Sequence, residues 1–280
     1  MAIDNPLPPT LIESQVKLAL QEDVGQQDLT ADLIPADALA TAQLITRQQA
    51  TLCGSDWFNA VFAKLDPTIT IDWQAKDGDR LKANDLICTI HGSARTILTA
   101  ERTAMNFLQT LSATATQAQQ YADAVAGLAV SVLDTRKTIP GWRQAQKYAV
   151  HCGGCDNHRI GLFDGILIKE NHINAAGSIR QAVSQAQQRH PNIPIEVEVE
   201  TQEELQQAIA AGADIVLLDN FDCEALIKAV QLNQGRVKLE ASGGITLENI
   251  RQIAKTGVDR ISVGAITKDI QAVDLSLRFQ

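Results

Sequence analysis

Short apolar, β-branched runs recur through the second half of the chain, and most are followed by a helical pattern. They occupy residues 130–133, 166–168, 195–199, 215–218, 237–239 and 261–263. Successive runs start 20 to 36 residues apart, which is the length of a strand followed by a helix. Strands that are apolar on both faces and alternate with helices predict a parallel sheet. Six in series favour an α/β barrel over the alternative, a doubly wound open sheet. No glycine-rich dinucleotide fingerprint follows the first run, which also favours the barrel.

The first part of the chain has a mixed pattern. Residues 10–22 read as a helix with a capping box of Thr10 and Glu13. Residues 57–65 read as a second helix, residues 68–73 and 85–90 as strands, and residues 99–111 as the start of a long helix. We therefore expect an N-terminal α+β sandwich domain over 1–111 and an open (β/α) barrel domain over 112–267. The segment at about 268–280 could pack back on the first domain.

Polar residues cluster where the predicted strands end, and the carboxyl ends of barrel strands carry the active site in folds of this kind. In chain order, the residues at these strand ends are 134–137, 169–172, Glu198, Glu200, Asp219, Asn220, Glu240, the run 242–244 and Gly264. Between residues 134 and 172 stand six basic residues against four acidic ones, in a chain whose net charge is −9. This local inversion of charge predicts a site for small anions.

The run 195–200 alternates strictly between aliphatic residues and glutamates, so its three glutamates share one face of a strand. A carboxylate inside a barrel needs a cation, a metal or a proton. We therefore expect Glu198 to lie near Lys169, Arg159 or Mg²⁺, whereas Glu200 suits the solvated rim.

Two glycine-containing segments follow the last predicted strands. Ser242, Gly243 and Gly244 precede a helix predicted to begin near Thr246, and Gly264 follows the run 261–263. Glycines that free backbone N–H groups beside a helix start form a phosphate cradle, which barrels usually place after their last strands. The sequence thus predicts phosphate binding here, although either segment alone is also compatible with a plain tight turn.

Composition narrows the class of protein further. The excess of acidic over basic residues argues against a nucleic-acid or membrane-surface binder, and no apolar run approaches a membrane span. The N-terminus lacks the features of a secretory signal, and five scattered cysteines suit a reducing compartment. We expect a cytoplasmic enzyme. The spacing of His151, Cys152, Cys155 and His158 superficially resembles a zinc or redox motif, an interpretation that its context does not favour.

Several motifs together resemble one family over nearly the whole chain. They are D-T-R-K-T-I-P-G-W-R at 134–143, N-H-R-I-G-L at 157–162, I-K-E-N-H at 168–172, E-V-E-V-E-T at 196–201, L-L-D-N at 217–220, E-A-S-G-G-I at 240–245 and A-E-R-T-A-M-N-F-L-Q at 100–109. In this order they resemble quinolinate phosphoribosyltransferase. The chain departs from the family pattern at Cys155, where a third glycine is usual, and at Gln27. Neither position belongs to the expected site.

The resemblance implies an activity and a set of roles. Quinolinate and phosphoribosyl pyrophosphate would give nicotinate mononucleotide, pyrophosphate and CO₂ with Mg²⁺, in a homodimer or larger homo-oligomer with shared active sites. The implied catalytic residues are Lys137, Lys169, Glu198 and Asp219, and the last two would hold ribose hydroxyls and Mg²⁺. The implied substrate-binding residues also include Arg102 from a neighbouring subunit, Thr135, Arg136, His158, Arg159, Ser242, Gly243, Gly244 and Gly264.

Two alternatives to this activity remain open at the level of sequence. A related pyridine phosphoribosyltransferase that does not decarboxylate its substrate would lack the full arginine set. A catalytically silent or transport-associated paralogue would bind an anionic ligand without turnover. The presence of Lys169, Glu198 and Asp219 argues against the silent form.

Overall fold

The computed structural model describes residues 7–280, and its helices and strands divide between two compact units. Among the described residues, unit 1 contains 7–119, 144–154 and 269–280, and unit 2 contains 120–143 and 155–268. The expected boundaries at 111 and 267 stay predictions. The N-terminal segment interpreted as lacking a secretory signal lies partly outside the described residues.

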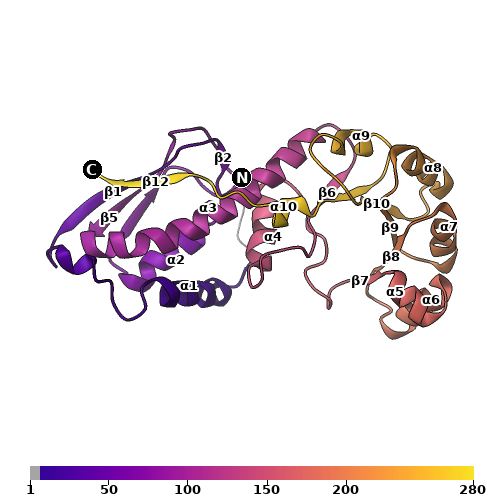
Figure 1. Cartoon of the computed structure of the whole chain (residues 1–280), viewed down its shortest axis with the longest axis horizontal. Helices are drawn as coiled ribbons and strands as arrows, with labels where there is room; N and C mark the ends of the chain where they lie inside the picture. The colour runs from indigo at the N-terminus through magenta and orange to yellow at the C-terminus, as the bar shows by residue number, and fades with distance from the viewer. Residues whose placement is uncertain (1–6) are drawn as a thin grey trace. The chain divides into compact units, whose positions relative to one another are not determined.

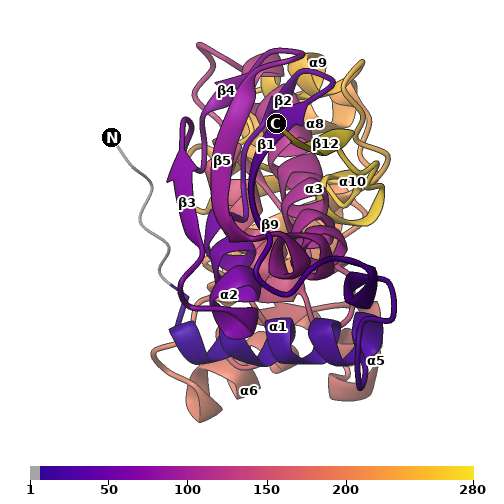
Figure 2. The same ribbon diagram turned by 90° about the vertical axis from the view of Figure 1, so that its left-hand side faces the viewer.

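Unit 1 is built on a four-stranded antiparallel sheet with the order β12-β1-β5-β3. Its elements are α1 (Pro9–Asp23), η1 (Ala31–Leu33), β1 (Leu39–Thr46), β2 (Ala50–Thr51), α2 (Ser55–Leu65), β3 (Thr70–Trp73), β4 (Arg80–Leu81), β5 (Leu86–Ser93), α3 (Ala94–Ala124, whose last turn belongs to unit 2), α4 (Arg143–Cys152) and β12 (Leu275–Phe279). The C-terminal strand β12 pairs with β1 along the register Ala42↔Phe279 to Thr46↔Leu275. Figure 2 shows this sheet beside α2, against which α1 packs.

The core of unit 1 is aromatic and aliphatic. Trp57, Phe58 and Phe62 on α2 and Phe107 on α3 are almost completely buried. The α2 rings follow from the helical spacing of apolar residues that predicted this helix. The predicted capping box is wrong, because α1 begins at Pro9 and no side chain caps it. Proline at the first helical position supplies the helical φ angle without a free N–H group, so this start needs no capping residue.

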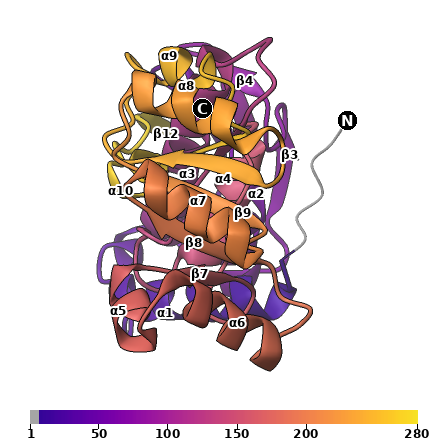
Figure 3. The same ribbon diagram turned by 90° about the vertical axis from the view of Figure 1, so that its right-hand side faces the viewer.

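Unit 2 is built on a six-stranded sheet with the order β6-β11-β10-β9-β8-β7, in which every pair is parallel. Its elements are β6 (Ser131–Leu133), β7 (Ile166–Ile168), α5 (Glu170–Ala176), α6 (Ile179–Arg189), β8 (Ile195–Val199), α7 (Gln202–Ala211), β9 (Ile215–Asp219), α8 (Cys223–Asn233), β10 (Lys238–Ser242), α9 (Ile250–Ala254), β11 (Arg260–Ser262) and α10 (Ala265–Lys268). Figures 1 and 3 show α7 and α8 along the outer face of β8 and β9. The strands alternate with helices as the barrel prediction required.

Local sequence signals define the helices of unit 2. The side chains of Ser178, Thr201 and Asp222 accept hydrogen bonds from backbone N–H groups in the first turns of α6, α7 and α8. Gly177 and Gly212 end α5 and α7 with φ angles of +95° and +84°, which glycine adopts without strain.

One predicted helix start is wrong. The helix expected near Thr246 is α9, which begins at Ile250. Asn249 explains the delay, because its side chain accepts a hydrogen bond from the N–H of Thr246 and donates one to the carbonyl of Gly244. These bonds hold residues 244–249 as a turn before the helix.

Candidate active site

A pocket of about 330 Å³ lies inside unit 2, at the carboxyl ends of the barrel strands. Its lining residues are Thr135, Arg136, Lys137, His158, Arg159, Leu167, Lys169, Glu198, Leu217, Asp219, Ser242 and Ser262. Strand register explains why they meet: Ser242 stands opposite Asp219, and Leu217 opposite Glu198. In parallel strands, side chains two residues apart along one strand face the same side. Lys169, two residues after Leu167, therefore points to the same side and also lines the pocket.

Nine of the expected site residues line this pocket, and four do not. Gly243 and Gly244 are exposed in the turn after β10, and Gly264 follows β11. Arg102 is an exposed residue of α3 in unit 1. Their assignment to substrate stays a prediction.

A Cβ atom at two of these positions would crowd a neighbouring side chain. A side chain at Gly264 would bring its Cβ within 3.1 Å of the Lys137 Cδ atom, so a larger residue would crowd a pocket-lining lysine. At Gly243 the φ angle is +95°, and a Cβ would lie 2.1 Å from the Oδ1 atom of Asn220. Both glycines keep the strand ends open beside the pocket.

Lys169, Glu198 and Asp219 form the polar centre of the pocket. The ammonium group of Lys169, one of the three partners that the sequence left open for Glu198, makes an ion pair with its Oε2 atom. Burial raises the pKa of Asp219, and the neighbouring Glu198 carboxylate raises it further, whereas Lys169 and Lys137 act to lower it. The lysines thus allow two carboxylates to share one pocket.

The cationic stretch between residues 134 and 172 does not lie entirely in the pocket. Lys147 is buried in unit 1. Arg143 donates to the carbonyl groups of Ile160 and Arg136, and so ties two loops together. The guanidinium group of Arg159 lines the pocket and donates to the carbonyl of Gly165 at 2.9 Å. Burial lowers the pKa of Arg159, and the nearby Arg136 lowers it further, which indicates a concentration of positive charge in the pocket.

His158 lies between two buried glutamates, Glu196 and Glu240. No role was assigned to either of them from the sequence. The Nε2 atom of His158 lies 3.0 Å from the Oε2 atom of Glu196 and 3.4 Å from the Oε1 atom of Glu240. Burial acts to lower the pKa of His158, and the neighbouring carboxylates of Glu196 and Glu240 act to raise it. Burial also raises the pKa of Glu196, which His158 partly offsets.

Sequence reasoning assigned no role to five residues of this region: Leu167, Glu196, Leu217, Glu240 and Ser262. A signal existed for each of them, since each stands two residues before an expected site residue at the end of its strand. The alternation that placed Glu198 in the interior also places Glu196 there. Ser262 stands two residues before Gly264 in the same way.

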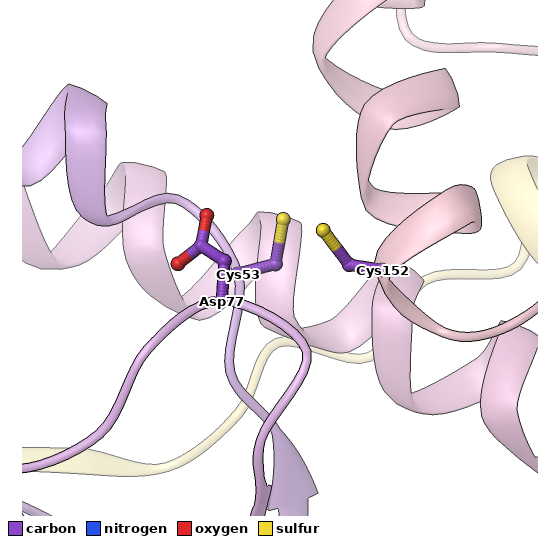
Figure 4. Close-up of side chains that lie close together, drawn as sticks. All are labelled: Cys53, Asp77 and Cys152. Atoms are coloured by element: carbon purple, nitrogen blue, oxygen red, sulfur yellow. The ribbon is translucent and has the colours of Figure 1, made fainter. Parts of the chain in front are cut away.

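A second cluster, of Cys53, Asp77 and Cys152, lies in unit 1 (Figure 4). The two sulfur atoms point toward one another, and all ligand atoms lie within 4.8 Å. The Asp77 carboxylate already accepts from the backbone N–H groups of Gly54 and Ser55 and from the Tyr148 hydroxyl group. Burial, with a hydrogen bond to Cys152, raises the pKa of the Cys53 thiol well above its usual value. These groups are satisfied without a metal.

The proposed spacing motif of His151, Cys152, Cys155 and His158 does not form a metal site among the described residues. Cys152 groups with Cys53 and Asp77, and His158 groups with Glu196 and Glu240. Cys155 is buried, and burial raises the pKa of its thiol to about 12. Such a thiol is a poor nucleophile and a poor metal ligand. Across residues 7–280, the helices all fall short of the length and apolar character needed to cross a membrane.

A parallel α/β barrel with cations and carboxylates at its strand ends defines the class of barrel enzymes that act on anionic substrates. Two sequence models of one family match the chain: "Quinolinate phosphoribosyl transferase, N-terminal domain" over residues 28–112, and the C-terminal domain over residues 114–278. The chain therefore belongs to the quinolinate phosphoribosyltransferase family.

Curated and structural relatives agree with this assignment. A probable carboxylating nicotinate-nucleotide pyrophosphorylase of Bacillus subtilis is 39% identical, over 91% of this chain and 89% of the relative. A carboxylating enzyme of the same name from Mycobacterium leprae is 38% identical over 94% and 95% of the two chains. The nicotinate-nucleotide pyrophosphorylase structure from Francisella tularensis is 51% identical with a TM-score of 0.96, over 99% and 98% of the chains. A silent or transport-associated paralogue finds no support among these relatives.

Proposed function

We propose that this chain transfers the phosphoribosyl group of phosphoribosyl pyrophosphate to quinolinate and decarboxylates the product. The products are nicotinate mononucleotide, pyrophosphate and CO₂, a step of NAD biosynthesis. The observation that carries the proposal is the pocket itself, where four cationic side chains and two carboxylates line one small cavity. Family membership supplies the identity of the substrates.

The cationic side of the pocket suits the pyridine dicarboxylate. Arg136, Lys137 and Arg159 line it, and arginine's planar fork matches carboxylate oxygens. The Nε atom of Arg136 is buried without a hydrogen-bond partner among residues 7–280, so a substrate carboxylate could provide one. Lys169 would neutralise charge between the substrate and the departing pyrophosphate.

The acidic side of the pocket suits the ribose. Glu198 and Asp219 would hold its hydroxyl groups and stabilise positive charge that develops on the sugar as the bond to pyrophosphate breaks. Ser242, Gly243, Gly244 and Gly264 would bind the 5′-phosphate. No covalent nucleophile is needed, because positioning and electrostatics account for the transfer.

Mg²⁺ is the cofactor that the family implies, and the residues present fit it. Glu198 and Asp219 supply carboxylate oxygens, the ligands that Mg²⁺ prefers, while it usually also binds substrate phosphates. Lys169 already pairs with Glu198, so Asp219 is the more available of the two. When bound, the ion would neutralise charge on the pyrophosphate.

Decarboxylation follows from the charge that transfer creates. When the ring nitrogen bonds to the ribose it becomes a pyridinium cation. The C2–CO₂ bond then breaks with its electron pair left on C2, where the cation stabilises it, and a proton completes the product. Arginines that hold the neighbouring carboxylate would keep the ring in place during this step.

The direct test is substrate replacement. Purified protein should consume quinolinate together with phosphoribosyl pyrophosphate and release CO₂ in equal amount. Consumption of nicotinate but not quinolinate would instead identify a phosphoribosyltransferase that does not decarboxylate. Calorimetry that showed binding of both substrates, with CO₂ release at background, would favour the silent paralogue.

We further propose that the enzyme acts in the cytoplasm as a homodimer or larger homo-oligomer in which Arg102 completes a neighbour's site. Mixing Arg102→Ala subunits with Lys137→Ala subunits should restore part of the activity, because some sites in the mixed assembly would be intact. Each variant alone should be inactive. Absence of any recovery in mixed assemblies of confirmed composition would contradict a shared site.

A further inference from the structure

The ring of His158 is hydrogen-bonded within the protein at both nitrogen atoms. The backbone N–H group of Arg159 donates to Nδ1 at 2.8 Å. A backbone amide can only donate through its N–H group, so Nδ1 must present a lone pair. The proton of a neutral ring then lies on Nε2, which faces Glu196 at 3.0 Å.

The carboxylates on the Nε2 side are among the most buried polar groups of unit 2. Glu240 is completely buried, and Glu196 is 4% exposed. They stand on β10 and β8, the two strands on either side of β9. Both oxygen atoms of Glu240 lack a well-aligned hydrogen bond among the described residues. A buried carboxylate with so few partners is costly, which indicates that it serves something other than stability.

A metal ion is a poor occupant of this cluster, although the three ligand atoms lie within 4.8 Å of one another. A histidine ligand binds a metal through a nitrogen lone pair. Here Nδ1 already accepts the Arg159 N–H bond, so Nε2 must keep the ring proton and has no lone pair to offer.

The contacts of His158 lead directly to a pocket cation. Asp134, completely buried at the end of β6, accepts from the His158 N–H group at 2.8 Å and from the Asn157 side chain at 2.9 Å. The His158 ring in turn holds the N–H group of Arg159, whose guanidinium group lines the pocket. The ring therefore connects the barrel interior to the backbone that carries Arg159.

From this chain of contacts we propose that Glu196 and Glu240 are positioning residues: they hold the His158 ring as its Nε2–H tautomer, and the ring places Arg159 for the substrate's carboxylate. The role of His158 is then to position Arg159 through its ring nitrogens. This inference rests on the proposed function, which makes Arg159 a ligand of quinolinate.

Other charged groups near the cluster are consistent with this arrangement. Arg260 on β11 acts to lower the pKa of Glu196, and the charge of Arg136 acts to lower the pKa of Arg159. Asp134 is occupied by the two donors named above. Because Nδ1 accepts the Arg159 N–H bond, the proton of the neutral ring is held on the side of the glutamates.

Nitrogen NMR of the substrate-free protein tests the tautomer without reference to activity. The chain has five histidines, and His158→Gln identifies the His158 signals by their loss. At pH 7 we expect one protonated ring nitrogen and one with a lone pair. Two protonated nitrogens, the signature of an imidazolium ion, would overturn the proposal.

Steady-state kinetics of Glu240 variants tests the positioning role. Glu240→Leu should raise the KM for quinolinate by on the order of 10-fold or more, because a small displacement of a binding group has a large effect. The KM for phosphoribosyl pyrophosphate should change much less. Glu240→Gln keeps an oxygen that accepts from Nε2–H, so it should recover most of the quinolinate affinity.

Controls separate this role from general damage and from failure of the proposed function. Glu203→Gln alters an exposed glutamate of α7 and should match the unaltered protein. Circular dichroism confirms that each variant is folded, and Glu196→Gln supplies a second variant if Glu240→Leu is not. An unchanged quinolinate KM in folded Glu240→Leu, or an equal rise for both substrates, would refute positioning. If the unaltered protein does not consume quinolinate, the proposed function is wrong. The NMR measurement still determines the tautomer of His158 in that case.

Discussion

The two units each bury acidic side chains, and they do so in opposite ways. In unit 1, Asp77 receives two backbone N–H groups from the start of α2 and a hydroxyl group from Tyr148. In unit 2, both oxygen atoms of Glu240 lack a well-aligned hydrogen bond among the residues described, and the nearest cation candidate is His158. The first carboxylate is satisfied by its surroundings, and the second is not.

This difference separates a structural carboxylate from a functional one. Asp77 has neutral partners fixed by the fold, at the positive end of a helix dipole, and it needs nothing more. Glu240 lies beneath a pocket whose lining includes His158, Arg159 and Lys169. Burial of a poorly satisfied charge costs stability, and proteins retain such groups mainly where a site requires them.

The largest expected effect concerns the pocket lysine. Lys169→Met removes the cation that pairs with Glu198 and leaves two carboxylates together, so kcat/KM should fall by on the order of 10²–10³. The matched control is Lys238→Met, whose ammonium group lies 2.8 Å from Asp259 and is 62% exposed. An exposed pair contributes little, so this control should leave kcat/KM unchanged. Equal losses in both variants would contradict a special role for Lys169.

The next expected effect concerns the Asp77 carboxylate of unit 1, whose loss should lower stability and leave activity unchanged. Asp77→Ala leaves the N–H groups of Gly54 and Ser55 and the Tyr148 hydroxyl group without their acceptor. The free energy of unfolding should fall by about 3 kcal/mol, measured by urea denaturation. At a temperature where the variant is folded, kcat/KM should stay the same. Asp66→Ala removes an acceptor of the N–H and hydroxyl groups of the exposed Thr68, and it should change the unfolding free energy much less.

Much of unit 2 could be predicted from the sequence. The runs at 166–168 and 195–199 match β7 and β8 without change, because a buried parallel strand needs a short apolar segment. Boundaries shifted where side chains compete with the backbone, as in the delayed start of α9. In unit 1, the long helix α3 begins at Ala94 rather than near residue 99, since its first turn lacks a clear apolar pattern.

For the site, the sequence alone determined which residues stand at the strand ends, because strand alternation and the order of elements are local properties. It therefore placed Lys169, Glu198 and Asp219 at the strand ends and named Lys169 as one of three candidate partners of Glu198. Only the tertiary structure decided what lies beneath them. Glu196 and Glu240 lie near each other because β8 and β10 flank β9 in the sheet. The His158 ring lies beside them because the backbone N–H group of His158 is hydrogen-bonded to Asp134. Such contacts join residues up to 82 positions apart (158 and 240), and pairing at that distance depends on how the sheet closes rather than on any local pattern.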